Sequence, residues 1–265
     1  MAVRDRVAML LLIVACTPIL VFLLVPSLII IPMALTRGEL IQFPPEWISV
    51  HAFADYLSDP QWMHSTWLSF KVAALTVALG CITGSAAALA LHARQFPGKG
   101  LVTSVILAPI VVPSIVLALG EYLLFAQIHM VGTWAAIGLV HAMLVTPYVF
   151  ISVQTSLIAE LNPALVRSAR SLGARRFSVF RHVYWPAMRP GVLSGAILGF
   201  AVSFDEVVVA LFLQGPSTVT LPVQMFTAIQ FELTPKVAAI ASLFIMLATL
   251  ALVAQSLLTS NRPAR

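Results

Sequence analysis

Charged side chains are scarce in this 265-residue chain. Asp, Glu, Lys and Arg together make up 9% of its residues, whereas soluble globular domains carry roughly 25%. Apolar residues make up 60% of the sequence, and the mean hydropathy is +0.99. This composition excludes an ordinary soluble domain and predicts a polytopic membrane protein.

Several chemical signatures are also absent. The two cysteines, Cys16 and Cys81, both lie in apolar runs, which indicates packing residues rather than a disulfide or a metal site. No Gly-x-x-x-x-Gly-Lys-Ser/Thr loop, helical His-Glu-x-x-His or nucleophile elbow occurs. We therefore predict that the chain is not an enzyme and has no catalytic residue, metal ligand or cofactor of its own. The placement of the charges, despite a net +5, does not indicate a nucleic-acid partner.

Six apolar segments approach the roughly 20 residues that a helix needs to cross a bilayer. They cover about 7–35, 66–91, 101–124, 133–156, 191–213 and 236–258. The first is too long for the core of a signal peptide, so we expect 7–35 to be a retained peripheral anchor. We predict a single membrane domain, 1–265, with its core at 66–258 and an interfacial helix within the polar segment 36–65.

The basic residues predict an orientation. With both termini in the cytoplasm, 12 of the 15 Lys and Arg residues lie on the cytoplasmic side, which is the excess that cytoplasmic loops carry. These residues are Arg4, Arg6, Arg94, Lys99, six arginines of one loop, Arg262 and Arg265. We therefore predict a multi-pass protein with both termini cytoplasmic.

The longest strongly polar interruption is Asn162–Pro190, which contains six arginines and no acid. Asn162 is suited to cap a helix N-terminus, and Pro163 is suited to its first position. Gly173 is placed to end that helix in a left-handed conformation, and a second short helix is expected to stop at Pro186. On the first helix, Leu165, Ala169 and Leu172 fall on one face at helical spacing, as do Val166, Ala169 and Gly173. On the second helix, Phe177, Phe180 and Tyr184 are expected on one side. A basic loop that only fixes topology is the alternative.

The same loop has a specific spacing. Arg167-Ser168-Ala169 is followed by three residues, Gly173, nine residues and Val183-Tyr184-Trp185-Pro186. This resembles the EAA loop of inner-membrane permeases of bacterial ABC importers, whose pattern is Glu-Ala-Ala, three residues, Gly, nine residues and Ile-x-Leu-Pro. The spacing is complete, while the residue types differ at Arg167, Ser168 and Trp185.

This resemblance implies an all-α type I ABC importer permease fold with six transmembrane helices. It also implies that the loop 157–190 contains a cytoplasmic coupling helix, which in the family sits in a groove of the ATP-binding subunit. The residues that the resemblance assigns to coupling are Arg167, Ser168, Ala169, Arg170, Leu172, Gly173 and Pro186.

Three acids lie within or at the edge of the expected spans: Glu121, Asp205 and Glu206. A charge deep in the bilayer costs roughly 3 kcal/mol on insertion scales, so each acid needs compensation. One interpretation is a packing role or an ion pair with a partner subunit. The other is a water-filled path for a cationic solute, with these three acids as pathway residues.

The region around two of these acids carries a second resemblance. Ser203-Phe204-Asp205-Glu206-Val207-Val208, Gly215-Pro216-Ser217 and Thr220-Leu221-Pro222-Val223 are similar to the second permease subunit of spermidine/putrescine transporters. The segment 107–119, LAPIVVPSIVLAL, is similar to the third span of those subunits. The resemblance implies that the solute is a polyamine or a related amine.

The importer class also implies partners in a bacterial inner membrane. They are an ATP-binding subunit dimer that carries ATP and Mg, a second permease subunit that we expect to be a different chain, a periplasmic or lipid-anchored solute-binding protein, and membrane lipid. The competing hypothesis is a secondary transporter or channel that works without an ATPase. Internal repeats are common in such folds, and none is visible in this sequence.

Overall fold

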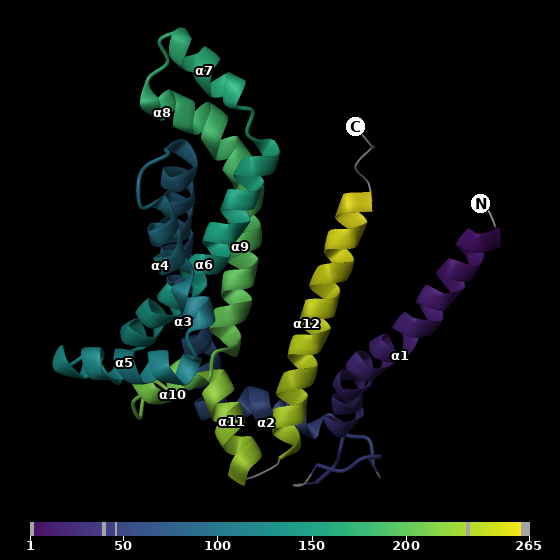
Figure 1. The fold of residues 1–265 in the computed structure, drawn as a ribbon. Coiled ribbons are helices and arrows are strands. Elements are labelled where there is room, and N and C mark those ends of the chain that lie inside the picture. Colours follow the sequence, from purple (N-terminus) through teal and green to yellow (C-terminus); the bar gives the residue numbers. More distant parts are fainter. Residues whose placement is uncertain (1–2, 39–40, 46, 232–233, 261–265) are drawn as a thin grey trace. The chain divides into compact units, whose positions relative to one another are not determined.

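The computed structural model describes residues 3–38, 41–45, 47–231 and 234–260 (Figure 1). The helices are α1 (Val3–Met33), α2 (His51–Ser58), α3 (Pro60–Ala93), α4 (Lys99–Val111), α5 (Ser114–Gln127), α6 (Trp134–Glu160), α7 (Pro163–Ser171), α8 (Arg176–Val179), the π-helical turn η1 (Phe180–Tyr184), α9 (Trp185–Asp205), α10 (Val208–Leu213), α11 (Leu221–Phe231) and α12 (Pro235–Ser260). Within these ranges there is no strand, only an isolated bridge between Thr36 and Ile48. The all-α prediction is confirmed.

Among the described residues, four helical segments are long and apolar enough to cross a membrane: Leu12–Met33, Pro60–Ala93, Trp134–Glu160 and Arg176–Asp205. A fifth crossing is present if the bent pair α4–α5 counts as one span, whereas the described apolar stretch of α12, Pro235–Leu247, is shorter. The expected number of six transmembrane helices is therefore not confirmed, since the described residues contain four candidate spans, or five with the bent pair.

The expected third span, 101–124, is not one helix. Its two halves, α4 and α5, are bent by 103°, because Val112 has extended dihedrals (φ −75°, ψ 131°) and Pro113 follows it. A residue before proline is pushed out of the helical region, and proline itself donates no backbone hydrogen bond. Pro109, by contrast, is accommodated inside α4. The break is therefore at Pro113, and not at every proline of the segment.

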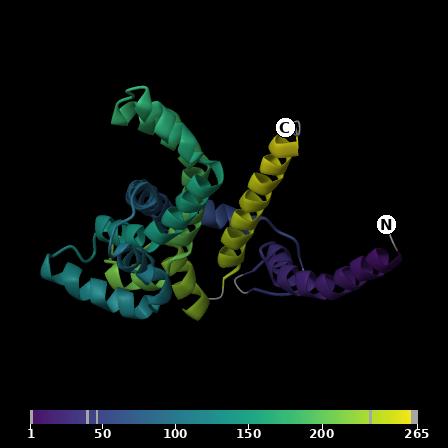
Figure 2. The same cartoon turned by 45° about the horizontal axis from the view of Figure 1, so that its top comes forward.

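The chain divides into two compact units, and the larger one comprises residues 64–224. Its central helix is α6, which runs beside α9 in both views (Figures 1 and 2). Glycines on α9 allow this close approach. A methyl group added at Gly191 would lie 2.5 Å from the carbonyl oxygen of Ser152, and one at Gly199 would lie 2.5 Å from Cγ1 of Val145.

The other unit comprises residues 1–63 and 225–265. In it, α12 packs against α1 and α2, around a small core of alanines: Ala34, Ala52, Ala238 and Ala239. The Ser242 hydroxyl donates to the carbonyl oxygen of Ile30 at 3.3 Å. The basic residues Arg262 and Arg265, used for the orientation, lie outside the described residues. The single-domain assignment of 1–265 stays a prediction.

Candidate functional site

The loop between α6 and α9 contains the expected first helix, α7. The Asn162 side-chain oxygen accepts a hydrogen bond from the backbone N–H of Ala164 at 2.9 Å, and Pro163 occupies the first helical position. Gly173 has φ +76°, and the N–H of Ala174 donates to the carbonyl of Ala169 across the end of the helix. Both predicted ends of α7 are confirmed, because each depends on local chemistry that the sequence states directly.

Of the two expected faces of α7, the one that carries Val166 and Ala169 is turned toward the protein. Val166 is buried and Ala169 is half-buried, and both pack onto the cluster that includes Leu157. Leu165 and Leu172 instead point outward, 57% and 87% exposed. The outer face of α7 therefore presents two large apolar side chains that the chain itself leaves uncovered.

The remaining predicted coupling residues gather on the same segment. Arg167, Ser168 and Arg170 of α7 are exposed, as are Gly173 and, farther along the chain, Pro186. The structure thus places six of the seven predicted residues on α7 or its C-terminal turn. Pro186 lies apart from them, at the start of α9.

The expected stop at Pro186 is wrong. The helical path runs through η1 into α9, and Arg176–Asp205 forms one candidate span. The N–H of Trp185 donates to the carbonyl of Phe180, five residues back. This π-helical turn changes the hydrogen-bond spacing just before the proline, so its missing N–H falls at the first turn of α9, where proline is tolerated. The same turn buries Val179 and Tyr184.

Phe177 is therefore not on one side with its expected neighbours. Its side chain is 70% exposed, whereas Tyr184 is 9% exposed. The expected face assumed ordinary α-helical spacing, and the π-helical turn shifts the residues after it around the axis. No local sequence signal specifies such a turn.

Asp205 and Glu206 mark a break in the expected fifth span, 191–213. Asp205 is the last residue of α9, and its side chain is exposed. Glu206 has extended dihedrals (φ −75°, ψ 113°), and its Oε1 atom accepts from the backbone N–H of Val209 at 3.0 Å. The two neighbouring acids thus have different environments, since Glu206 caps the start of α10 and Asp205 has no such bond.

Glu121 lies on α5, which packs against α10. Its side chain is half-buried. Within the described part of the chain, no ion pair or hydrogen bond joins it to Asp205 or Glu206. The structure packs α5, which carries Glu121, against α10, whose start Glu206 caps, without joining these carboxylates.

An aromatic cluster that the sequence analysis missed adjoins Asp205. The rings of Phe70 on α3 and Phe204 on α9 lie 5.3 Å apart between centroids, and Phe200 and Phe204 stack at 5.3 Å. Phe200 and Phe204 are one helical turn apart, which was the available signal. Their contact with α3 depends on tertiary packing, which no local pattern specifies.

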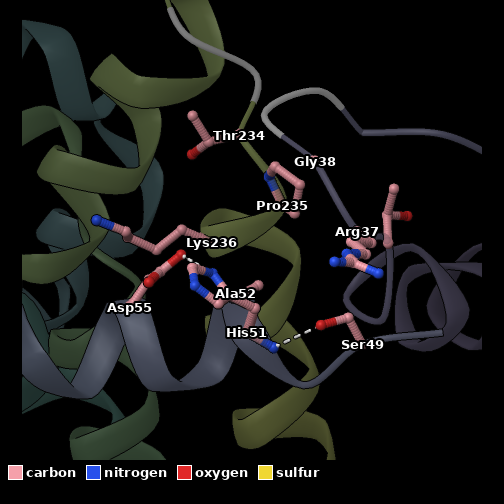
Figure 3. Close-up of a pocket in the computed structure, with 10 residues that line it drawn as sticks. Arg37, Gly38, Ser49, His51, Ala52, Asp55, Thr234, Pro235 and Lys236 are labelled. Carbon is pink, nitrogen blue, oxygen red and sulfur yellow. Dashed lines mark hydrogen bonds and ion pairs between the residues drawn. The ribbon is translucent and has the colours of Figure 1, made fainter. Parts of the chain in front are cut away.

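The unit that contains α1, α2 and α12 has a cavity of about 780 Å³. Figure 3 shows side chains around it from the segment after α1, from the start of α2 and from the start of α12. Arg37, His51, Asp55 and Lys236 supply its charged or ionisable groups. His51 Nδ1 lies 2.7 Å from Asp55 Oδ2. No sequence pattern points to this set, because Lys236 is far from the other three residues in the chain.

The apolar spans are those of an integral membrane protein. The chain belongs to the family described as binding-protein-dependent transport system inner membrane component, which its residues 78–262 match. This match confirms the resemblance to ABC importer permeases. It includes α7 and the acids of α5 and α9, but not α1 or α2.

Curated relatives cover most of the chain. It is 30% identical over 232 residues to the putrescine transport system permease protein PotI of Escherichia coli (strain K12), covering 84% of this chain and 82% of the relative. It is 31% identical over 198 residues to the spermidine/putrescine transport system permease protein PotC of Haemophilus influenzae, covering 74% and 75%. The molybdenum transport system permease protein ModB of Escherichia coli (strain K12) is 31% identical over 193 residues, covering 66% and 82%.

Solved structures share the fold at lower identity. A bacterial alginate ABC transporter, solved in complex with an alginate pentasaccharide-bound periplasmic protein, contains a chain with a TM-score of 0.74 and 16% identity, covering 98% of this chain and 95% of that one. An amino acid ABC transporter with histidines gives a TM-score of 0.56 at 20% identity, covering 78% and 95%. These likenesses show an importer permease fold.

Proposed function

We propose that this chain is the transmembrane permease subunit of an ATP-driven importer that depends on a solute-binding protein. The observation that carries the proposal is α7, a short helix beyond the spans with a buried inner face and an uncovered outer face. Leu165 and Leu172 on that outer face are more than half exposed. Large exposed apolar side chains gathered on one helix are typical of a docking surface.

The occupant of this surface is an ATP-binding subunit. The exposed Arg167 and Arg170 surround the two leucines with positive charge, which suits an acidic rim on the partner. Two ATP-binding subunits, carrying ATP and Mg²⁺, work with this chain and a second permease subunit. The excess of basic residues in its loop favours a cytoplasmic α7, and the description of the family supports the inner membrane as the location.

The proposed solute is a polyamine or a related amine. Two relatives near 30% identity are putrescine and spermidine/putrescine permeases by name. Asp205 is exposed at the end of α9, and the stacked rings of Phe200 and Phe204 lie on the last turns of the same helix. A carboxylate attracts an ammonium group strongly in a narrow path of low dielectric, and aromatic faces attract cations within about 6 Å.

The outer face contacts the solute-binding protein. The cavity shown in Figure 3 lies where α2 and α12 begin, on the side opposite α7 in the proposed topology. Its Arg37 side chain forms no ion pair with any described residue. It is therefore suited to an acidic side chain of that partner.

The test is uptake of labelled putrescine by proteoliposomes that contain this chain, its second permease subunit and its ATP-binding subunits. We expect uptake to require ATP on the side of the membrane where the ATP-binding subunits lie. It should also require the solute-binding protein on the opposite side. Uptake by this chain alone, driven by an ion gradient, would instead establish the secondary transporter or channel. ATP-driven uptake of a neutral solute with no competition from putrescine would keep the importer class and remove the polyamine.

A further inference from the structure

A second cavity lies within the larger unit, beside the coupling loop. Its volume is about 750 Å³, and three arginines line it, each from a different element. Arg94 follows the end of α3, Arg170 belongs to α7 and Arg176 begins α8. Figure 1 shows α7 and α8 beyond the end of α3. The cavity thus connects the loop to a spanning helix.

The charge of this cavity is unbalanced. No Asp or Glu lines it, and none of the three arginines forms an ion pair within the described ranges of the chain. All three side chains are exposed, so their positive charge is available to a ligand. Guanidinium groups bind phosphate oxygens with charge-assisted, often bidentate hydrogen bonds. The cavity therefore favours an anion with several acceptor oxygens.

The rest of the lining identifies where the anion comes from. Leu89 and Ala93 belong to α3, within the candidate span Pro60–Ala93. On the loop side, Val179 and Tyr184 form a buried apolar wall. An apolar wall that continues a membrane span into a basic rim matches a phospholipid, whose phosphate lies beside its acyl chains. A carboxylate from a soluble partner would need the arginines but not the apolar wall.

We propose that this cavity binds the headgroup of an anionic phospholipid of the cytoplasmic leaflet. Basic pockets beside transmembrane helices on that side bind such headgroups in other membrane proteins. One lipid in this position links α3 to the segment that carries α7. Membrane composition thereby influences the placement of the coupling loop. This inference goes beyond the proposed transport function, and it rests on that function only for the assignment of the cavity to the cytoplasmic leaflet.

The experiment titrates the purified full-length chain, in detergent, with phosphatidylglycerol or phosphatidylcholine and measures bound lipid by native mass spectrometry. The pocket variant combines Arg94→Gln, Arg170→Gln and Arg176→Gln. The matched control combines Arg175→Gln, Arg181→Gln and Arg189→Gln, which are exposed arginines of the same loop that do not line the cavity. Both variants lose the same charge, and a third variant with Lys at the three pocket positions keeps it.

We expect the pocket variant to bind phosphatidylglycerol at least about tenfold more weakly than the wild type. The control and the Lys variant stay within a few-fold of the wild type, and phosphatidylcholine binding is unchanged. Circular dichroism establishes that all three variants fold.

Equal loss in the pocket variant and the control would overturn the site, because the effect would then be general charge. Displacement of phosphatidylglycerol by inorganic phosphate at about 10 mM would assign the cavity to a free anion. Unchanged lipid binding, with loss of the copurifying ATPase only in the pocket variant, would assign it to a protein partner.

Discussion

The Nζ atom of Lys236 lies 2.8 Å from Oδ2 of Asp59, so the first turn of α12 is joined to the residue between α2 and α3. The other carboxylate oxygen of Asp59, Oδ1, accepts from the backbone N–H of Gln61 at 3.0 Å. One side chain therefore both caps α3 and holds α12. Its hydrogen bond with Lys236 is the main reason that the pKa of Asp59 lies below its ordinary value.

The first prediction separates these two contributions. Asp59→Asn keeps an oxygen that can cap α3 but loses the charge, and we expect it to cost about 0.5 kcal/mol of stability at pH 7. Asp59→Ala also loses the cap, and we expect a further cost of about 1 kcal/mol. Thermal unfolding of the purified chain measures both. Asp55→Asn is the control, because its pair with His51 is far more exposed and should contribute little.

The pH dependence of this pair has a defined sign. A carboxyl group with a lowered folded-state pKa stabilises the fold above its unfolded pKa, about 3.9, and the contribution disappears as pH falls through the lower folded value. The difference between wild type and Asp59→Asn should thus be constant from pH 7 to pH 5 and shrink below about pH 4. A difference that persisted undiminished below that range would show that the pair is not electrostatic.

A second prediction concerns the contact between α6 and α9. A Cβ atom at Gly191 would lie 2.5 Å from the Ser152 carbonyl oxygen and 2.7 Å from Cα of Val153, and backbone atoms cannot easily move away. We expect Gly191→Ala to cost about 1–3 kcal/mol, seen as a lower thermal midpoint. Gly120→Ala is the matched control, because Gly120 is also helical and has no atom within 4 Å of the added Cβ. It should be neutral or stabilising, and equal effects of both changes would contradict the close approach.

Parts of the fold that depend on local chemistry could be predicted from the sequence. Asn162 and Gly173 set the ends of α7 through their own side-chain acceptor and backbone freedom. The breaks at Val112 and Glu206 could not be predicted in the same way, because an apolar run with one proline or one acid is compatible with both a straight and a broken helix. Tertiary packing of α5 on α10 accompanies both breaks, and it involves residues far apart in the chain.

The same distinction applies to the candidate site. The sequence located the coupling segment and left two faces open for its first helix, one with Leu165 and Leu172 and one with Val166, both including Ala169. The structure turns Val166 and Ala169 toward the core. Periodicity gives the angles between side chains, and it does not say which side of a short amphipathic helix the rest of the protein covers. From the sequence, Arg94 contributes only a positive charge to the predicted orientation. Its cavity could not be predicted, because the other two arginines that line it, Arg170 and Arg176, are about 80 positions away in the chain.

The third prediction tests the docking face of α7. Leu172 is 87% exposed, so Leu172→Ser should leave folding and membrane insertion unchanged. If the ATPase covers this side chain, its loss should weaken the complex by roughly tenfold, the effect of removing a central interface residue. Copurification of the ATPase and stimulation of its activity by the permease measure this. Phe177→Ser is the control, because Phe177 is similarly large and exposed but lies on α8. If Leu172→Ser formed a normal complex, the docking role of α7 would be contradicted. The basic loop would then only fix the topology of the chain.

The last prediction concerns the two acids at the end of α9. No described residue forms an ion pair or hydrogen bond with the Asp205 carboxylate, whereas Glu206 caps α10 through Val209. Asp205→Asn should therefore leave assembly unchanged and lower putrescine uptake per purified complex, by roughly tenfold if one ammonium–carboxylate contact is lost. Glu206→Gln keeps an acceptor oxygen for α10 and should preserve assembly, while Glu206→Ala should reduce the yield of complexes because the cap is lost.

Normalising uptake to purified complex separates transport from assembly in these variants. A pathway role for Asp205 requires a lower rate per complex, and the loss should be smaller for a neutral competitor than for putrescine, because only a cation gains from the carboxylate charge. A purely structural role would instead lower the amount of complex and leave the rate per complex unchanged. Full transport of putrescine by the double variant Asp205→Asn, Glu206→Gln would remove both acids from the path, and the aromatic cluster of Phe70, Phe200 and Phe204 would then be the next element to alter.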